Sequence, residues 1–145
     1  MSSQLIAKVN QSLKIHGYRY SVLRDKILEI LDLSDEPATV LNIISGLAKG
    51  KIHPNKTTVY RELETLTKHN IIYEVNLGEG KKRYELASDQ PHPHLICKKC
   101  GSIKCTRLNL TIESWLSSFC TQNNFKLEDH VLEFFGICQI CNQTN

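Results

Sequence analysis

The sequence predicts an α+β protein made of two domains, residues 1–87 and 88–145, and two observations predict this division. All six cysteines lie in the second part, and the first part carries thirteen Lys/Arg against ten Asp/Glu, whereas the second has five of each. The turn-forming residues 88–91 mark the boundary, because such residues interrupt periodic structure. We therefore expect a mildly basic domain without thiols, followed by a neutral domain organised around Cys and His.

Four amphipathic helices are expected in the first domain. Apolar residues recur every three or four positions within residues 5–16, 21–32, 40–49 and 54–69. Thr39 is suited to cap the third helix, and Gly17 and Gly50 are plausible stops for the first and third. Val59, Leu63 and Leu66 form the expected buried stripe of the fourth helix.

A hairpin follows these helices. Residues 71–75 and 81–86 are expected strands, joined by the glycine-containing turn 77–80. Helices followed by a cationic hairpin are typical of a winged helix, in which the fourth helix enters the major groove and the hairpin faces phosphates. The candidate DNA contacts are Arg19, Lys56, Thr57, Tyr60, Arg61, Lys81 and Lys82, with Arg83 extending the cationic run. An ordinary solvated face is the alternative, because such layouts also mediate protein contacts.

The second domain contains two Cys-x-x-Cys pairs, Cys97 with Cys100 and Cys138 with Cys141. Two intervening residues let a tight turn direct both sulfurs at one ion, and two such pairs complete a four-thiolate zinc site. Redox pairs or incidental thiols are the alternatives, but neither pair lies in a recognisable βαβ setting. A domain of this size buries little apolar surface, so bound Zn²⁺ would supply folding free energy.

Between the two pairs we expect a strand over 102–105, a helix over 110–123 and a long strand over 125–135. The helix should direct Ile112, Leu116 and Phe119 inward. Cys120 on the same helix is expected to be a buried apolar residue.

The order of three motifs resembles the ferric uptake regulator (Fur) family over essentially the whole chain. They are Thr58-Val59-Tyr60-Arg61 in the fourth helix, the His-x-His-x-x-Cys-x-x-Cys-Gly segment that begins at His92, and the C-terminal Cys-x-x-Cys. The resemblance implies a homodimeric metal-dependent transcription regulator, usually a repressor, that binds a double-stranded DNA operator. It implies a winged-helix DNA-binding domain over 1–87 and a small α/β dimerisation domain over 88–145. By this resemblance Tyr60 and Arg61 are DNA contacts, and the four paired cysteines hold structural zinc.

The same resemblance makes Glu85, His92 and His94 ligands of a regulatory metal between the domains. His92 and His94 alternate on an extended segment, so both imidazoles should face one side. Cys105 occupies a position where relatives often have a carboxylate ligand, and it is either a thiolate ligand or a strand residue. A thiolate favours Zn²⁺, whereas imidazoles and a carboxylate also accept Fe²⁺ or Mn²⁺.

The chain departs from the family pattern at several positions. Glu36-Pro37 stands where many relatives have a histidine ligand, which is missing here or replaced by Glu36. Glu113 and His130 match two positions of a further metal site, but Pro91 and Pro93 occupy the positions of its other two ligands. Ala87 stands where the zinc-uptake subgroup often has a cysteine.

Two other classes of function compete with metal-dependent regulation. A peroxide sensor of the same fold, using Fe²⁺ or Mn²⁺, remains an alternative. An enzyme is not expected, because no nucleophile or general base accompanies the ligands, and no small-molecule substrate is implied. No apolar run approaches the roughly 20 residues of a membrane helix, so we expect a cytoplasmic protein without membrane contact.

Overall fold

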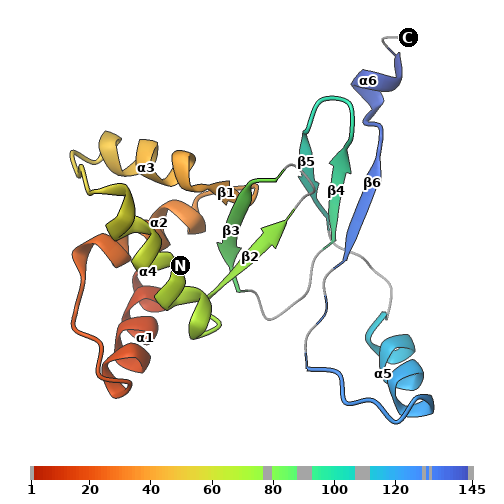
Figure 1. The fold of residues 1–145 in the computed structure, drawn as a ribbon, viewed down its shortest axis with the longest axis horizontal. Coiled ribbons are helices and arrows are strands. Elements are labelled where there is room, and N and C mark those ends of the chain that lie inside the picture. The colour runs from red at the N-terminus through yellow and green to blue at the C-terminus, as the bar shows by residue number, and fades with distance from the viewer. Residues whose placement is uncertain are drawn as a thin grey trace. The chain divides into compact units, whose positions relative to one another are not determined.

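The structure is a computed structural model that describes residues 2–76, 80–87, 93–106, 112–128, 130 and 132–143. Two compact units divide the chain, Met1–Ala87 and Ser88–Asn145, and Figure 1 shows the elements of each. Residues 77–79 of the expected turn and the boundary segment 88–91 lie outside the described residues.

The first unit contains the four expected helices. They are α1 (Ser2–Ile15), α2 (Val22–Asp32), α3 (Val40–Lys49) and α4 (Lys56–Lys68). Side chains just before three of them satisfy first-turn amides: Ser21 accepts from Arg24, Thr39 from Asn42, and Asn55 from Thr57. Gly17 ends the first helical segment with a φ of 82°, a left-handed conformation that glycine adopts without strain.

A three-stranded antiparallel sheet completes this unit. Its strands are β1 (Ala38–Thr39), β2 (Ile72–Asn76) and β3 (Lys82–Leu86), in the order β1-β3-β2. The two-residue β1 was not expected, because so short a segment shows no alternation of polar and apolar residues. The hairpin β2–β3 confirms the expected wing.

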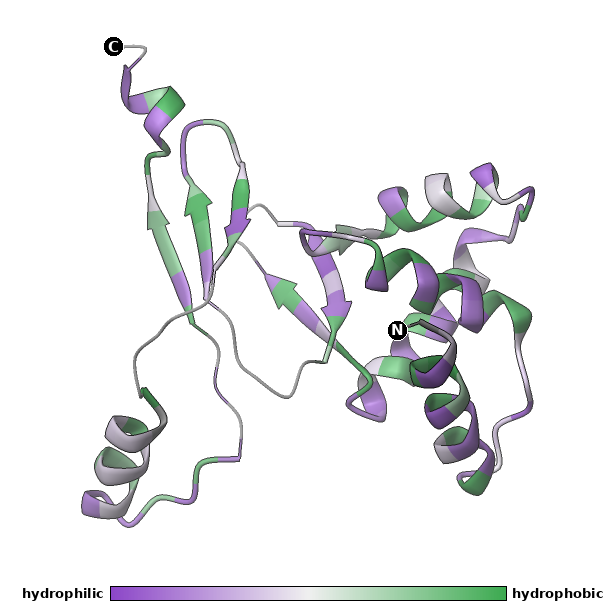
Figure 2. Cartoon of the chain, turned by 180° about the vertical axis from the view of Figure 1, so that it is seen from behind, coloured by the Kyte–Doolittle hydropathy of each residue, from purple (hydrophilic) through white to green (hydrophobic). Residues whose placement is uncertain are grey.

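The core of the first unit lies between the helices and the sheet. Each helix has a hydrophobic and a hydrophilic side (Figure 2). The expected stripe of α4 is confirmed, since Val59, Leu63 and Leu66 are all buried. The core also contains Leu13, Ile27, Leu28, Ile43, Leu47 and Ile72.

The second unit contains a smaller sheet with two helices. Its elements are β4 (His94–Cys97), β5 (Ile103–Cys105), α5 (Ile112–Gln122), β6 (Glu133–Gly136) and α6 (Gln139–Gln143). The strand order is β5-β4-β6. Strand β4 pairs antiparallel with β5 and parallel with β6. This parallel pairing determines where the second cysteine pair lies.

Two expectations for the second unit are wrong. The strand expected over 125–135 is short: β6 begins at Glu133, and residues 125–128 have no regular structure. All four residues of β4 are already paired with β6, so β4 offers no partner to the earlier residues. Phe119 does not point inward, because 52% of it is exposed and its ring stacks on Trp115 at 5.5 Å. The inward face of α5 instead includes Cys120, whose expected burial is confirmed.

Candidate zinc centre and nucleic-acid interface

The four paired cysteines meet at one edge of the second sheet. Cys97 ends β4, and Cys100 lies in the turn that follows. Cys138 comes just after β6, and Cys141 lies in α6. Because β4 and β6 are parallel, their C-terminal ends lie side by side, and this brings the two pairs together. All four sulfur atoms lie within 4.8 Å of one another.

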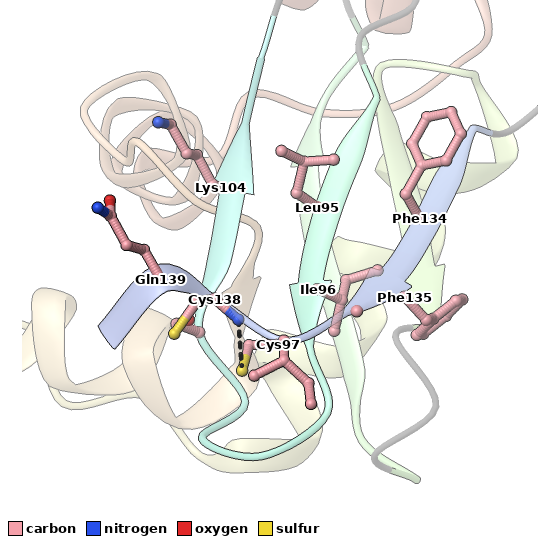
Figure 3. A pocket seen from close by; sticks show the side chains of 11 residues that line it. Leu95, Ile96, Cys97, Lys104, Phe134, Phe135, Cys138 and Gln139 are labelled. Atoms are coloured by element: carbon pink, nitrogen blue, oxygen red, sulfur yellow. Dashed lines mark hydrogen bonds between the residues drawn. The ribbon is translucent and has the colours of Figure 1, made fainter. Parts of the chain in front are cut away.

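The spacing of the sulfurs fits a tetrahedral zinc ion. The Sγ atoms of Cys100 and Cys138 are 3.8 Å apart. Four thiolates at a Zn–S distance of about 2.3 Å have sulfurs about 3.8 Å apart. The backbone N–H of Cys138 donates to Sγ of Cys97 over 3.3 Å, as Figure 3 shows. This bond joins the two cysteine pairs and stabilises a thiolate at Cys97.

Three of the thiols, those of Cys97, Cys100 and Cys141, have pKa values shifted in different directions. Backbone N–H donors, first that of Cys138 and then that of Cys100, lower the pKa of Cys97 to about 6. Ser102, whose hydroxyl oxygen lies 3.2 Å from Sγ of Cys100, lowers the pKa of the Cys100 thiol. Contact with Cys100 and then Cys138 raises the pKa of Cys141 to about 12. Hydrogen bonds to the neighbouring sulfurs keep Cys141 protonated, and a divalent cation would displace that proton, so this donor set suits Zn²⁺.

Ser102 was not among the residues that sequence reasoning identified. A hydroxyl two residues after the second cysteine of a Cys-x-x-Cys pair is the signal that could have indicated it.

The second unit also brings together two of the expected regulatory ligands. His94 begins β4 and is only 3% exposed. It pairs in register with Cys105 of β5, so both side chains lie on the same face of the sheet. Within the described parts of the chain, the four zinc-type cysteines are the one group of three or more metal-type donors that lie within 4.8 Å of one another.

The remaining expected ligands are distributed as follows. Glu85 is half-buried in β3 of the first unit, and His130 is half-buried in the second. His92 lies outside the described residues, as does the side chain of Glu113.

Two of the three prolines at expected ligand positions are part of the packing, since Pro37 and Pro93 are fully buried. The third, Pro91, lies outside the described residues. The carbonyl of Pro37 also accepts a hydrogen bond from Nη1 of Arg83 over 3.3 Å. Glu36, the neighbouring candidate, is exposed.

Helix α4 presents the predicted polar face to solvent. Lys56, Thr57, Tyr60 and Arg61 are all exposed. The ammonium of Lys56 lies 5.8 Å from the centre of the Tyr60 ring, a cation–π contact that holds both side chains near the start of the helix. The face therefore combines cations, hydroxyls and an aromatic ring, as required for contacts to phosphates and base edges.

The cationic residues of the wing do not all face solvent. Lys81 and Lys82 are exposed, and Nζ of Lys82 lies 3.0 Å from Oε2 of Glu74 on the neighbouring strand. Hydrogen bonding to Glu74 also raises the pKa of Lys82. Arg83 is half-buried, and its Nη1 donates to the carbonyl of Pro37, so its contact with phosphates stays a prediction.

Arg19, the other DNA-contact candidate of the first unit, is exposed. Its carbonyl accepts a hydrogen bond from Nη1 of Arg24 over 3.1 Å.

An open apolar cavity of about 340 Å³ lies beside the cysteine edge in the second unit (Figure 3). Four exposed apolar residues line it, Leu95, Phe134, Phe135 and Ile137, together with the buried Ile96. Contiguous exposed apolar surface of this kind marks interaction sites.

No described helix is both long and apolar enough to cross a membrane.

Comparisons with known proteins agree with this architecture. The family model "Ferric uptake regulator family" matches residues 15–135. The ferric uptake regulation protein of Campylobacter upsaliensis is 31% identical over 140 residues, which cover 95% of this chain and 89% of that protein. The fold is similar to that of the Helicobacter pylori ferric uptake regulator (TM-score 0.83, 25% identity, 98% of this chain and 94% of that one). It is also similar to the Vibrio cholerae regulator (TM-score 0.73, 28% identity, 89% and 98%). The chain therefore belongs to the ferric uptake regulator family of metal-responsive transcription regulators.

Proposed function

We propose that this protein is a homodimeric, metal-dependent repressor of metal-uptake or metal-homeostasis genes. The observation that carries the proposal is the presence, in one chain, of an exposed DNA-type face on α4 and a preformed four-thiolate site in the other unit. The face on α4 binds double-stranded DNA, and metal at the four-cysteine site stabilises the domain through which two copies associate.

Structural zinc is the proposed occupant of the four-cysteine site. None of the residues of α6 is buried, so apolar packing contributes little to holding the helix against the sheet. Thiolate–zinc bonds through Cys138 and Cys141 would fix the C-terminal segment to the end of β4. The role is stabilisation of the second unit, because a closed four-thiolate site leaves no open coordination position for chemistry.

A second, regulatory metal is proposed at Glu85, His92 and His94, with Cys105 as a fourth ligand. The in-register pairing of His94 with Cys105 supports a nitrogen and a sulfur donor on one face of the sheet. This donor set suits Zn²⁺, and without the thiolate it would accept Fe²⁺ or Mn²⁺. Glu113 and His130 are proposed as weaker candidates for a further site. The Helicobacter pylori relative is described as having three functional metal binding sites, which supports more than one site here.

Ligands from both units would restrict how the units are oriented. A dimer that binds two half-sites needs its recognition helices about one DNA turn, roughly 34 Å, apart. When orientation is unrestricted, DNA affinity falls in proportion to the fraction of molecules in the competent arrangement. Glu85, His92 and His94 would thereby couple metal binding to DNA binding.

The proposed dimer would cover the exposed apolar face of the second unit. Leu95 and Phe134 pair in register on neighbouring strands and present two large exposed side chains on one face of the small sheet. Burial of such a patch against a second copy would stabilise the association through the hydrophobic effect.

Binding to DNA selected from a random duplex library tests the function. We expect a selected duplex to bind the metal-loaded protein, and chelation that leaves the four-cysteine zinc in place to reduce affinity at least tenfold. Tyr60→Ala and Arg61→Ala should reduce specific binding with zinc content unchanged. Glu64→Ala, on the same exposed face, tests whether any change there has the same effect.

Two outcomes would change the proposal. Metal-independent binding would remove the regulatory metal from the mechanism. Loss of DNA binding after peroxide treatment of the Fe²⁺-loaded protein, with one oxygen added to His92 or His94 by mass spectrometry, would instead favour peroxide sensing.

A further inference from the structure

We propose that Glu133 is a positioning residue for His94: its carboxylate accepts the imidazole N–H that remains when the other ring nitrogen binds the regulatory metal. This inference rests on the proposed regulatory site at His94 and assigns a role to a residue outside that ligand set. It follows from the way three strands of the second unit are aligned.

Cys105, His94 and Glu133 form one row across the sheet. His94 pairs in register with Cys105 of β5 on one side and with Glu133 of β6 on the other. Backbone bonds fix both alignments: N–H of His94 donates to the carbonyl of Leu132 over 3.0 Å, and N–H of Thr106 donates to that of Pro93 over 3.2 Å. Residues paired in register project from the same face of a sheet. His94 therefore stands between Cys105 and Glu133 in one row on one face of the sheet.

The width of this row decides what Glu133 can do. Adjacent strands are about 4.8 Å apart, so the Cβ atoms of Cys105 and Glu133 are separated by roughly 10 Å. Metal–ligand bonds of about 2.0–2.3 Å do not let the short side chain of Cys105 and the carboxylate of Glu133 share one ion. A glutamate next to His94 can, however, reach its ring. The metal would lie on the Cys105 side and the N–H on the Glu133 side.

Histidine ligands need this kind of support. A metal-bound imidazole uses one nitrogen as ligand and carries a hydrogen on the other, and a carboxylate that accepts this hydrogen fixes the ring and increases ligand basicity. His94 is 3% exposed, so bulk water is poorly placed to serve as the acceptor. Glu133 is half-buried beside it, where a charge-assisted hydrogen bond is stronger than in bulk water.

Cobalt binding to the full-length, zinc-loaded protein tests the inference. Titration with Co²⁺, followed by calorimetry and by the thiolate-to-cobalt absorption of Cys105, reports the second site directly. We expect Glu133→Ala to weaken Co²⁺ binding about 10–100-fold, as loss of other supporting carboxylates does. Glu133→Gln should weaken it less, because the amide oxygen still accepts the N–H. The control is Glu128→Gln, an exposed glutamate of the same unit that should bind as wild type.

The outcomes separate this inference from the function on which it rests. If His94→Ala loses the second Co²⁺ while Glu133→Ala binds within twofold of wild type, the role of Glu133 is wrong and the regulatory site stands. If His94→Ala binds as wild type, the regulatory site itself is wrong. If Glu133→Ala also loses zinc from the four cysteines, Glu133→Met decides, since it nearly preserves volume but lacks the carboxylate: Co²⁺ affinity within twofold of wild type there overturns the inference.

Discussion

Arg24 on α2 and Glu62 on α4 form an ion pair with Nε and Oε2 2.8 Å apart, and the Arg24 side chain is buried. The hydroxyl of Ser21 donates to the other carboxylate oxygen of Glu62 over 3.0 Å. One carboxylate thus joins the cap and first turn of α2 to the helix that presents Tyr60 and Arg61. The orientation of the proposed DNA-reading helix depends on a contact that lies away from its exposed face.

Glu62→Ala should destabilise the first unit by about 3–5 kcal/mol, because it leaves the buried guanidinium of Arg24 without its carboxylate. Denaturant unfolding of wild type and variant measures the difference. Glu128→Ala removes the partner of Lys126 in a pair whose side chains are 78% and 87% exposed. It should change stability by less than about 1 kcal/mol. If both variants lose the same free energy of unfolding, burial does not make the Arg24–Glu62 pair contribute more than an exposed pair.

Cys141→Ser should release zinc and unfold the second unit, because structural zinc contributes on the order of 10 kcal/mol in small modules. Zinc content and circular dichroism measure both effects. Cys120→Ala serves as the control, since this buried thiol lies outside the four-sulfur cluster and its loss should leave zinc content at the wild-type value. A folded Cys141→Ser protein with full zinc content would contradict the site.

Zinc binding should release fewer than four protons per ion at pH 8. Cys97, with a pKa of about 6, is already a thiolate there, whereas Cys141, with a pKa of about 12, must lose its proton to the solvent. As the pH falls through about 6, Cys97 becomes protonated in the metal-free protein. Each bound zinc should then release one more proton, and affinity should fall more steeply with pH. Calorimetry in buffers of different ionisation enthalpy counts the protons, and four at pH 8 would contradict the unequal ionisation.

Much of the first unit could be predicted from sequence because its signals are local. Ser21, Thr39 and Asn55 cap helices by bonding to residues two or three positions along the chain. The apolar stripe of a helix can likewise be found within that helix alone. The cysteine cluster was predictable because two Cys-x-x-Cys pairs have the spacing typical of a zinc site. The inward face of α5 and the start of β6 were not, because they depend on tertiary packing and on how many residues β4 can pair. The alignment of Glu133 with His94 is likewise a property of strand register, which no local pattern reveals.

Glu74→Gln should strengthen binding to all DNA sequences, because it releases Lys82 from its ion pair at 3.0 Å. Lys82→Ala should weaken binding uniformly and lower the slope of log affinity against log salt by about one unit, as for loss of one phosphate contact. Salt titrations of binding to unrelated duplexes measure both variants. The paired variant Glu74→Gln/Lys82→Ala is the control and should match Lys82→Ala alone. If Glu74→Gln has the same effect with and without Lys82, the wing lysine is not the phosphate contact.

Cys105→Ser separates the two readings of the thiol opposite His94. Thiolate is a softer donor than hydroxyl and favours Zn²⁺ over Mn²⁺, so loss of a ligand thiolate should weaken the DNA-binding response to zinc more than the response to manganese or iron. His94→Ala should abolish the response to all three ions while the four-cysteine zinc stays bound, because it removes a donor that every metal uses. Metal-titrated DNA binding with each ion in turn measures the contrast. Curves for Cys105→Ser that match wild type for all three ions would make Cys105 a strand residue beside the site, and the regulatory metal would then be held by nitrogen and oxygen donors alone.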